Sequence, residues 1–138
     1  METNQKSLYI IIIGCGRLGS LLANMLSKEG HSTVIIDNNI HSFDALNSTE
    51  FSGFQIEGDA TELSVLKEAK IDKADILIGA THDDNINIMI GQIAKRVFTV
   101  PNVLIRILDQ NKEPLLQKID IKYVCTTTEI ASKIIELI

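Results

Sequence analysis

The stretch Ile10-Ile11-Ile12-Ile13-Gly14-Cys15-Gly16-Arg17-Leu18-Gly19 decides the fold of this chain. An apolar run ends in glycines at the spacing G-x-G-x-x-G, and apolar residues then recur at helical spacing. Gly14 permits a tight turn, Gly16 lets a phosphate approach the backbone, and Gly19 lets the helix pack closely on its strand. The free N–H groups of the first helical turn, at the positive end of the helix dipole, favour an anion. The stretch therefore predicts a strand, a phosphate-binding turn and a helix.

An acidic residue follows the next expected strand. Residues 33–37 form an apolar run that ends in Asp37, 18 positions after Gly19. At this spacing a carboxylate accepts hydrogen bonds from both hydroxyls of a ribose and repels a 2′-phosphate. No arginine follows at Asn38 or Asn39, so NADP is disfavoured. Asn38, next to Asp37, is also expected to bind the cofactor. The alternative interpretation of Asp37 is a solvated acid at the end of a strand.

Length and composition limit the class of protein. With 138 residues, of which 45% are hydrophobic, we expect one domain over residues 1–138. The net charge of −5, without a basic stripe, disfavours nucleic acid as a partner. The longest apolar run, residues 8–13, is too short to span a bilayer, and no signal peptide is evident. Two cysteines without metal-ligand spacing fit a reduced, cytoplasmic protein.

Strand and helix patterns alternate along the whole chain. The expected strands cover residues 8–13, 33–37, 54–57, 75–81, 103–108 and 123–125. The expected helices cover residues 17–29, 41–47, 61–69 with Thr61 as N-cap, 84–98, a short segment after Pro114, and a last segment capped by Thr128. This order predicts a Rossmann-like, doubly wound α/β fold with a mostly parallel six-stranded sheet and helices on both faces. The last helix carries Ile130, Ile134 and Leu137, so we expect it to pack on a partner or a second domain.

A series of segments resembles one known family, the TrkA N-terminal domain, also called the RCK or KTN domain. The matching segments are residues 12–19, 34–37, 58–61, 74–81, 83–87 and 101–106, in that order. The sequence Gly58-Asp59-Ala60-Thr61 is the most specific of them, because it is not a general feature of dehydrogenases. The chain departs from the family pattern at Asn85, at Asp120, and in the absence of the C-terminal lobe that commonly follows.

The resemblance also implies a set of ligand-binding residues. It places Asp59 and Ala60 beside an adenine and lets Arg17 contact phosphates, including those of a neighbouring subunit. Ala80 and Thr81 end a strand with small side chains that leave room for a ligand. The expected cofactor-binding residues are Gly14, Cys15, Gly16, Arg17, Leu18, Gly19, Asp37, Asn38, Asp59, Ala60, Ala80, Thr81 and Arg106. Arg106, the one charge in its strand, faces the ligand, a neighbouring subunit or, equally, solvent.

The function that the resemblance implies is regulation of a potassium channel or potassium uptake system from the cytoplasmic side. The implied ligands are NAD(H), ATP or ADP, with AMP as a further candidate, and the ligand switches conformation without being consumed. The implied assembly is a homo-oligomer of paired domains beside a membrane subunit. Two alternatives stay open: a fragment of an NAD-dependent oxidoreductase, and an assembly module with a vestigial pocket. His31, His41 and His82 are expected on surface loops, and the pair Asp83-Asp84 is expected to start a helix.

Overall fold

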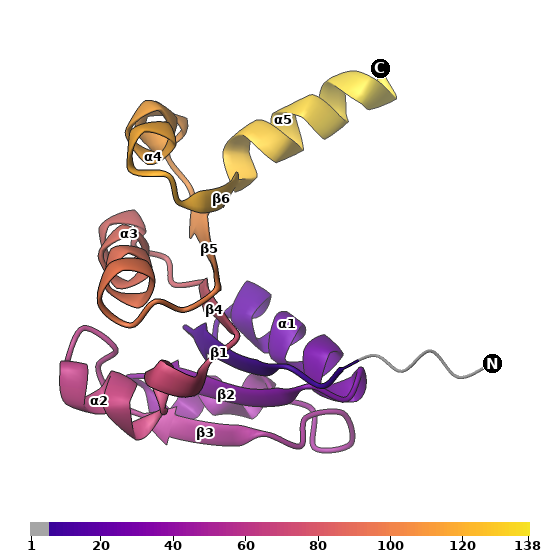
Figure 1. Cartoon of the computed structure of the whole chain (residues 1–138). Helices are drawn as coiled ribbons and strands as arrows, with labels where there is room; N and C mark the ends of the chain where they lie inside the picture. Colours follow the sequence, from indigo (N-terminus) through magenta and orange to yellow (C-terminus); the bar gives the residue numbers. More distant parts are fainter. Residues whose placement is uncertain (1–5) are drawn as a thin grey trace.

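The computed structural model describes residues 6–138 and shows one six-stranded sheet (Figure 1). Residues 1–5, which the expected domain bounds include, lie outside the described residues. The strands are β1 (Tyr9–Ile13), β2 (Ser32–Asp37), β3 (Phe54–Glu57), β4 (Ile76–Gly79), β5 (Asn102–Ile107) and β6 (Lys122–Cys125). Their order is β3-β2-β1-β4-β5-β6 and every pairing is parallel. The predicted doubly wound α/β fold is therefore confirmed, with a sheet that is entirely parallel over these residues.

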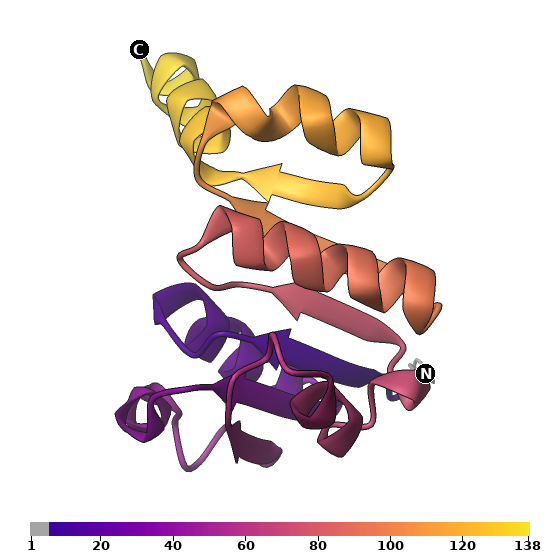
Figure 2. The same ribbon diagram turned by 90° about the vertical axis from the view of Figure 1, so that its left-hand side faces the viewer.

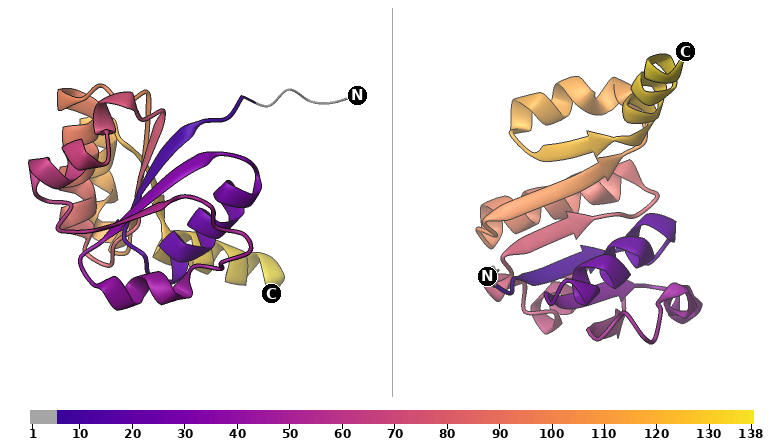
Figure 3. Two further views of the ribbon diagram at one scale, coloured as in Figure 1. Left: turned by 90° about the horizontal axis from the view of Figure 1, so that it is seen from below. Right: turned by 90° about the vertical axis from the view of Figure 1, so that its right-hand side faces the viewer.

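Helices cover the two faces of the sheet unequally. The α-helices are α1 (Arg17–Lys28), α2 (Leu63–Glu68), α3 (Asp84–Gln92), α4 (Glu113–Ile119) and α5 (Thr126–Leu137). Helices α3 and α4 lie in front of the strands in Figure 2, and α1 lies on the opposite face in the right-hand view of Figure 3. A π-helical segment, η3 (Ile93–Val97), continues α3, and a 3₁₀ segment, η1 (Ile40–Ala45), follows β2. No helix among residues 6–138 has the length and apolarity needed to cross a bilayer.

The centre of the core is β1. Its four isoleucines, residues 10–13, are at most 2% exposed, as the unbroken apolar run of a strand covered on both faces requires. Ile11 and Ile13 pack with residues of α2, α3 and α4, whereas Ile10 and Ile12 pack with α1 and η1. Because β1 lies between β2 and β4, the chain leaves β1 and β4 toward opposite faces of the sheet. In such sheets a crevice for ligands opens at this point, beyond the carboxyl ends of the strands.

Two predicted helix caps are wrong. Helix α2 begins at Leu63 and its N-cap is Glu62, without a side-chain hydrogen bond, because Thr61 is held in the preceding turn by Asp59. Helix α5 begins at Thr126, two residues before the predicted cap. Thr128 Oγ1 instead donates to Glu113 Oε2, at 3.0 Å. In both places another hydrogen bond takes the hydroxyl that was expected to cap the helix: one within its own turn for Thr61, and one to α4 for Thr128.

Helix α5 extends from the β6 edge of the sheet, away from the other helices (Figure 1). Its first turn is held to the fold, since Thr127 Oγ1 donates to Leu108 O at 2.6 Å. No residue of α5 is buried, and its apolar residues are largely exposed: Ile130, Ile134, Ile135 and Leu137. The expected packing surface of this helix is therefore present, and it is uncovered within the described chain.

Candidate functional site

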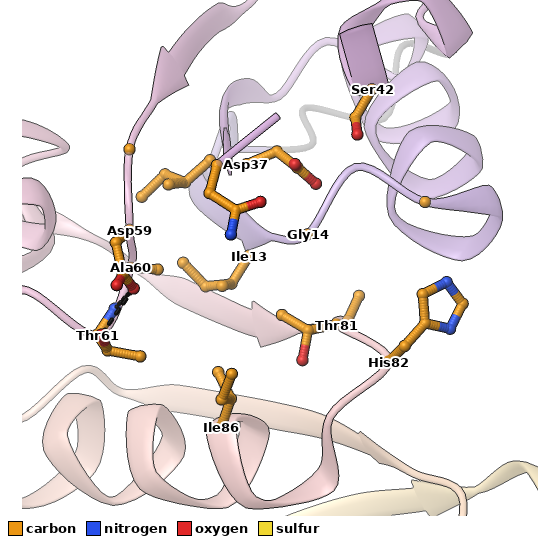
Figure 4. A pocket seen from close by; sticks show the side chains of 15 residues that line it. Ile13, Gly14, Asp37, Ser42, Asp59, Ala60, Thr61, Thr81, His82 and Ile86 are labelled. Carbon is orange, nitrogen blue, oxygen red and sulfur yellow. Dashed lines mark hydrogen bonds between the residues drawn. The ribbon is translucent and has the colours of Figure 1, made fainter. Parts of the chain in front are cut away.

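A cavity of about 330 Å³ lies at the carboxyl edge of the sheet, where β1, β2, β3 and β4 end (Figure 4). The residues that line it are Ile13, Gly14, Gly16, Ile36, Asp37, Asn38, Ser42, Gly58, Asp59, Ala60, Thr61, Ala80, Thr81, His82 and Ile86. Eight of these belong to the thirteen residues predicted to bind a cofactor: Gly14, Gly16, Asp37, Asn38, Asp59, Ala60, Ala80 and Thr81. The fold thus brings loops that are far apart in the sequence to one place.

The glycine turn after β1 allows no side chain at two of its glycines. Gly14 has a φ of +97°, and its N–H donates to Ile36 O at 2.8 Å, which ties the turn to β2. A Cβ on Gly14 would lie 3.0 Å from backbone atoms of Ala80 and Thr81. A Cβ on Gly19 would lie 1.8 Å from Gly14 O, so α1 packs directly against the turn. Both positions therefore serve the fold, as the predicted roles of the first and last glycine require.

Gly16 differs from the other two glycines of the motif. Its backbone is extended, with a φ of −81° and a ψ of −159°, and the nearest atom to an added Cβ is His82 Nε2, at 3.1 Å. Gly16 is the N-cap of α1, where no side chain caps the helix. The positive end of a twelve-residue helix is therefore left without a side-chain partner at the cavity. This arrangement suits an anion such as a phosphate.

Asp37 stands at the end of β2 and holds the glycine turn. Its Oδ2 accepts from Cys15 N and its Oδ1 accepts from Asn39 N, both at 2.8 Å. The side chain is half-buried and lines the cavity. A carboxylate has about four acceptor positions, so these two bonds leave capacity for the two hydroxyls of a ribose. The carboxylate thus has a structural role in addition to the predicted ligand role.

The turn after β3 is closed by Asp59. Its Oδ1 accepts from Thr61 N at 2.8 Å and from Thr61 Oγ1 at 2.6 Å, drawn as dashed lines in Figure 4. These hydrogen bonds to the charged form lower the pKa of the Asp59 carboxyl. Ala60 follows with its small side chain on the cavity wall. The turn therefore presents an ionised carboxylate and an apolar surface side by side.

The loop after β4 is fixed from beneath by Asn87 and Arg106. Asn87 is fully buried, and its Oδ1 accepts from Thr81 Oγ1 at 2.6 Å and from Thr81 N at 3.1 Å. Arg106 Nη2 donates to Ala80 O at 2.9 Å and to Thr81 O at 2.8 Å. Burial lowers the pKa of the Arg106 guanidinium, and the nearby Asp84 opposes that shift. Arg106 is not a lining residue, so in this structure it supports the cavity wall through the loop.

The other predicted residues of the glycine motif do not line the cavity. Cys15 is buried, and its thiol donates to Ser42 O at 3.3 Å. Burial, with a smaller contribution from the neighbouring Asp37 charge, raises the pKa of the Cys15 thiol to about 11. Arg17 is exposed at the start of α1, and neither Leu18 nor Arg17 lines the cavity. Within the glycine motif, only Gly14 and Gly16 therefore line the space where a ligand would sit.

Seven lining residues were not among the thirteen predicted: Ile13, Ile36, Ser42, Gly58, Thr61, His82 and Ile86. His82 lies on an exposed loop after β4, as expected, and its imidazole points toward the glycine turn (Figure 4). Its position directly after Thr81, a predicted site residue, was the sequence signal that could have indicated a place in the site. Asp83, in contrast, is the predicted helix start, since its Oδ1 accepts from Asn85 N at 2.9 Å. No cluster of three potential metal ligands occurs among residues 6–138.

Sequence comparisons identify relatives of the chain. It is 34% identical over 128 residues to the Trk system potassium uptake protein TrkA of Streptomyces coelicolor, covering 93% of this chain and 57% of that protein. It is 39% identical over 113 residues to the Trk system potassium uptake protein TrkA homolog of Pyrococcus abyssi, covering 81% of this chain and 49% of that protein. The chain thus spans about half the length of the curated relatives that it matches.

Structural comparisons agree with the fold. The TrkA-N domain of the inner membrane protein ybaL from Escherichia coli superposes with a TM-score of 0.83 at 20% identity, over 96% of this chain and 98% of that one. The GsuK channel bound to NAD superposes with a TM-score of 0.76 at 23% identity, over 99% of this chain and 24% of the channel. The sequence model of the TrkA-N domain matches residues 10–127. The chain therefore belongs to the TrkA-N domain family, as the ordered motifs indicated.

Proposed function

We propose that this chain is a nucleotide-sensing regulatory domain of a potassium uptake system or potassium channel. The observation that carries the proposal is the pairing, across one cavity, of the Asp37 carboxylate with the uncapped N-terminus of α1. The first group suits a ribose and the second suits a phosphate, so together they favour a nucleotide with both. The proposed binding residues are the thirteen predicted from the sequence, with Cys15, Leu18, Gly19 and Arg106 acting through the shape of the wall.

The proposed ligand is an adenine nucleotide: NAD(H), ATP, ADP or AMP. Proteins of the same fold support this choice, because the GsuK channel binds NAD and ADP, and a Kef CTD from Shewanella denitrificans binds AMP. A 2′-phosphate would meet the negative charge of Asp37, and neither Asn38 nor Asn39 offers a cation to balance it. NADP is therefore the nucleotide that the site suits least.

The proposed partners are a second copy of this chain and a membrane potassium transporter or channel. The exposed apolar face of α5 supports pairing, because no residue of this helix is buried within its own chain and exposed apolar surface of this kind marks contact sites. TrkA proteins, named for potassium uptake, are the relatives that support the membrane partner. In this proposal the domain works at the inner face of the cell membrane through that partner. Ligand binding acts by favouring one arrangement of paired domains over another, to the extent of its differential affinity.

We propose no reaction for the domain. Relatives that carry the name of a potassium uptake protein support a regulatory role. A dehydrogenase would also need a substrate site and a positioned acid or base beside the cofactor. The titratable groups of the cavity wall are Asp37, Asp59 and His82. Asp37 and Asp59 are already engaged in hydrogen bonds that hold their own turns, which supports binding rather than catalysis.

The test is to identify the nucleotide that gently purified protein carries, by mass spectrometry of the released small molecules. Titration of the emptied protein with NAD⁺, NADH, NADP⁺, ATP, ADP and AMP then gives the order of affinities. The proposal predicts a bound adenine nucleotide and the weakest binding for NADP⁺. A folded protein that binds none of these ligands would contradict the proposal and would favour the assembly module.

A further inference from the structure

His82 lies against the part of the glycine turn where a phosphate would bind. Its imidazole points toward the glycine turn in Figure 4, and its Nε2 is 3.1 Å from the position that a Cβ would take on Gly16. The residue lies on the exposed loop that follows β4, and its side chain lines the cavity. A hydrogen-bond donor at Nε2 would therefore face the same space as the uncapped N-terminus of α1.

The other nitrogen of this imidazole faces Arg106, since His82 Nδ1 lies 3.5 Å from Arg106 Nη2. Both protons of Nη2 are donated to backbone carbonyls, to Ala80 O at 2.9 Å and to Thr81 O at 2.8 Å. The contact with Nδ1 therefore leaves the ring proton free to reside on Nε2, the nitrogen that faces the glycine turn.

We infer that His82 is a phosphate-contacting residue of the nucleotide site and donates from Nε2 to a phosphate oxygen at the glycine turn. The inference rests on the proposed function and adds a specific preference to it. His82 strengthens binding of nucleotides that carry phosphate and contributes nothing to the binding of adenosine.

The first experiment compares ADP with adenosine on the full chain by calorimetric titration. In His82→Ala we expect ADP affinity to fall at least about tenfold, the effect of one hydrogen bond to a charged group, while adenosine affinity stays the same. In His82→Gln, where the side-chain amide can still donate, we expect most of the ADP affinity to remain. His41→Gln is the matched control, because His41 is an exposed histidine of η1 that does not line the cavity.

The outcomes separate this inference from the proposed function. Unchanged ADP affinity in His82→Ala, or an equal loss of ADP and adenosine affinity, would overturn the role of His82 while leaving nucleotide binding intact. A wild-type chain that binds no ADP would overturn the proposed function and this inference together. The donor role is tested directly by ¹⁵N NMR of the imidazole nitrogens in the ADP complex. A proton on Nε2 is expected there, and an Nε2 without a proton would overturn the assignment.

Discussion

The carboxyl edge of the sheet and helix α5 are the two most different regions of this molecule. At the edge, Asp37, Asp59, Asn87 and Arg106 each make at least two hydrogen bonds to the loops that they hold. In α5, polar contacts from the rest of the fold reach only the first turn, and the apolar residues beyond it are exposed. Tertiary hydrogen bonds therefore fix the shape of the edge, whereas α5 beyond its first turn is held only by its own helical hydrogen bonds.

This difference separates binding from assembly. A cavity whose wall is held by buried polar contacts is formed before a ligand arrives, which reduces the entropy lost on binding. The apolar surface of an exposed helix stays in contact with water, which is unfavourable, until another surface covers it. Substitutions at the edge should therefore affect folding or ligand affinity, and substitutions in α5 should affect association.

The largest effect is expected for Gly19→Ala. The added Cβ would lie 1.8 Å from Gly14 O, and neither backbone can move without breaking the contact between α1 and β1. We expect a loss of about 3 kcal/mol or more in the free energy of unfolding, at the upper end of overpacking effects. Urea denaturation followed by circular dichroism measures it. In the control Gly30→Ala, nothing lies within 4 Å of the new Cβ and only the positive φ is strained, so a loss of about 1–2 kcal/mol is expected.

The second largest effect is expected for Asn87→Ala. We expect a loss of about 2–4 kcal/mol in the free energy of unfolding, because the change leaves buried polar groups of the loop after β4 without hydrogen bonds. Asn87 Nδ2 also donates to Arg106 O at 2.9 Å, so the change loosens β5 as well. The control is Asn85→Ala on the same helix, an exposed position where a change within about 0.5 kcal/mol is expected. Equal stability of the two variants would show that the edge is not held as described.

Gly16→Ala should separate ligand binding from folding. The backbone of Gly16 is acceptable for alanine, and the new methyl group would meet only the flexible side chain of His82. We expect a change in unfolding free energy within about 1 kcal/mol, since no buried contact is lost. We also expect ADP binding at least about tenfold weaker, because the methyl group occupies the approach to the phosphate. Wild-type affinity in this variant would place the phosphate elsewhere.

Ile134→Glu should have the smallest effect on the fold. The side chain is 56% exposed, so the unfolding free energy of the monomer should stay within about 0.5 kcal/mol of wild type. Its helix content should stay the same. The proposed pairing of two copies should weaken, because a charge would be buried in the apolar contact. Analytical ultracentrifugation measures this. An oligomer that persists in the variant would show that another surface forms it.

Sequence predicted the parts of the site that depend on short-range chemistry. Gly14, Gly16, Gly19 and Asp37 are fixed by the spacing between a turn, a helix and the next strand, and the cavity forms among their loops. The family resemblance added the turn after β3, and the fold brings that turn to the same cavity.

The residues that support this site could not be predicted. Asn87 and Asp84 are polar residues near the start of a helix, and only the tertiary structure shows that both are buried beneath neighbouring loops. Asp84 accepts from Leu108 N and Asp109 N, which follow β5. His82 was missed for the same reason, because its partners Gly16 and Arg106 are distant in the sequence.

The most direct test of the central claim changes the ligand and leaves the protein intact, because Asp37 also holds Cys15 N and its substitution would disturb the turn. Wild-type protein is titrated with ADP and with 2′,3′-dideoxy-ADP, which lacks the hydroxyls that Asp37 is expected to bind. We predict that ADP binds about 10–100-fold more tightly, as expected for hydrogen bonds to a charged carboxylate. Equal affinity for the two ligands, or no binding of either by the folded protein, would contradict the assignment of this cavity as an adenine-nucleotide site.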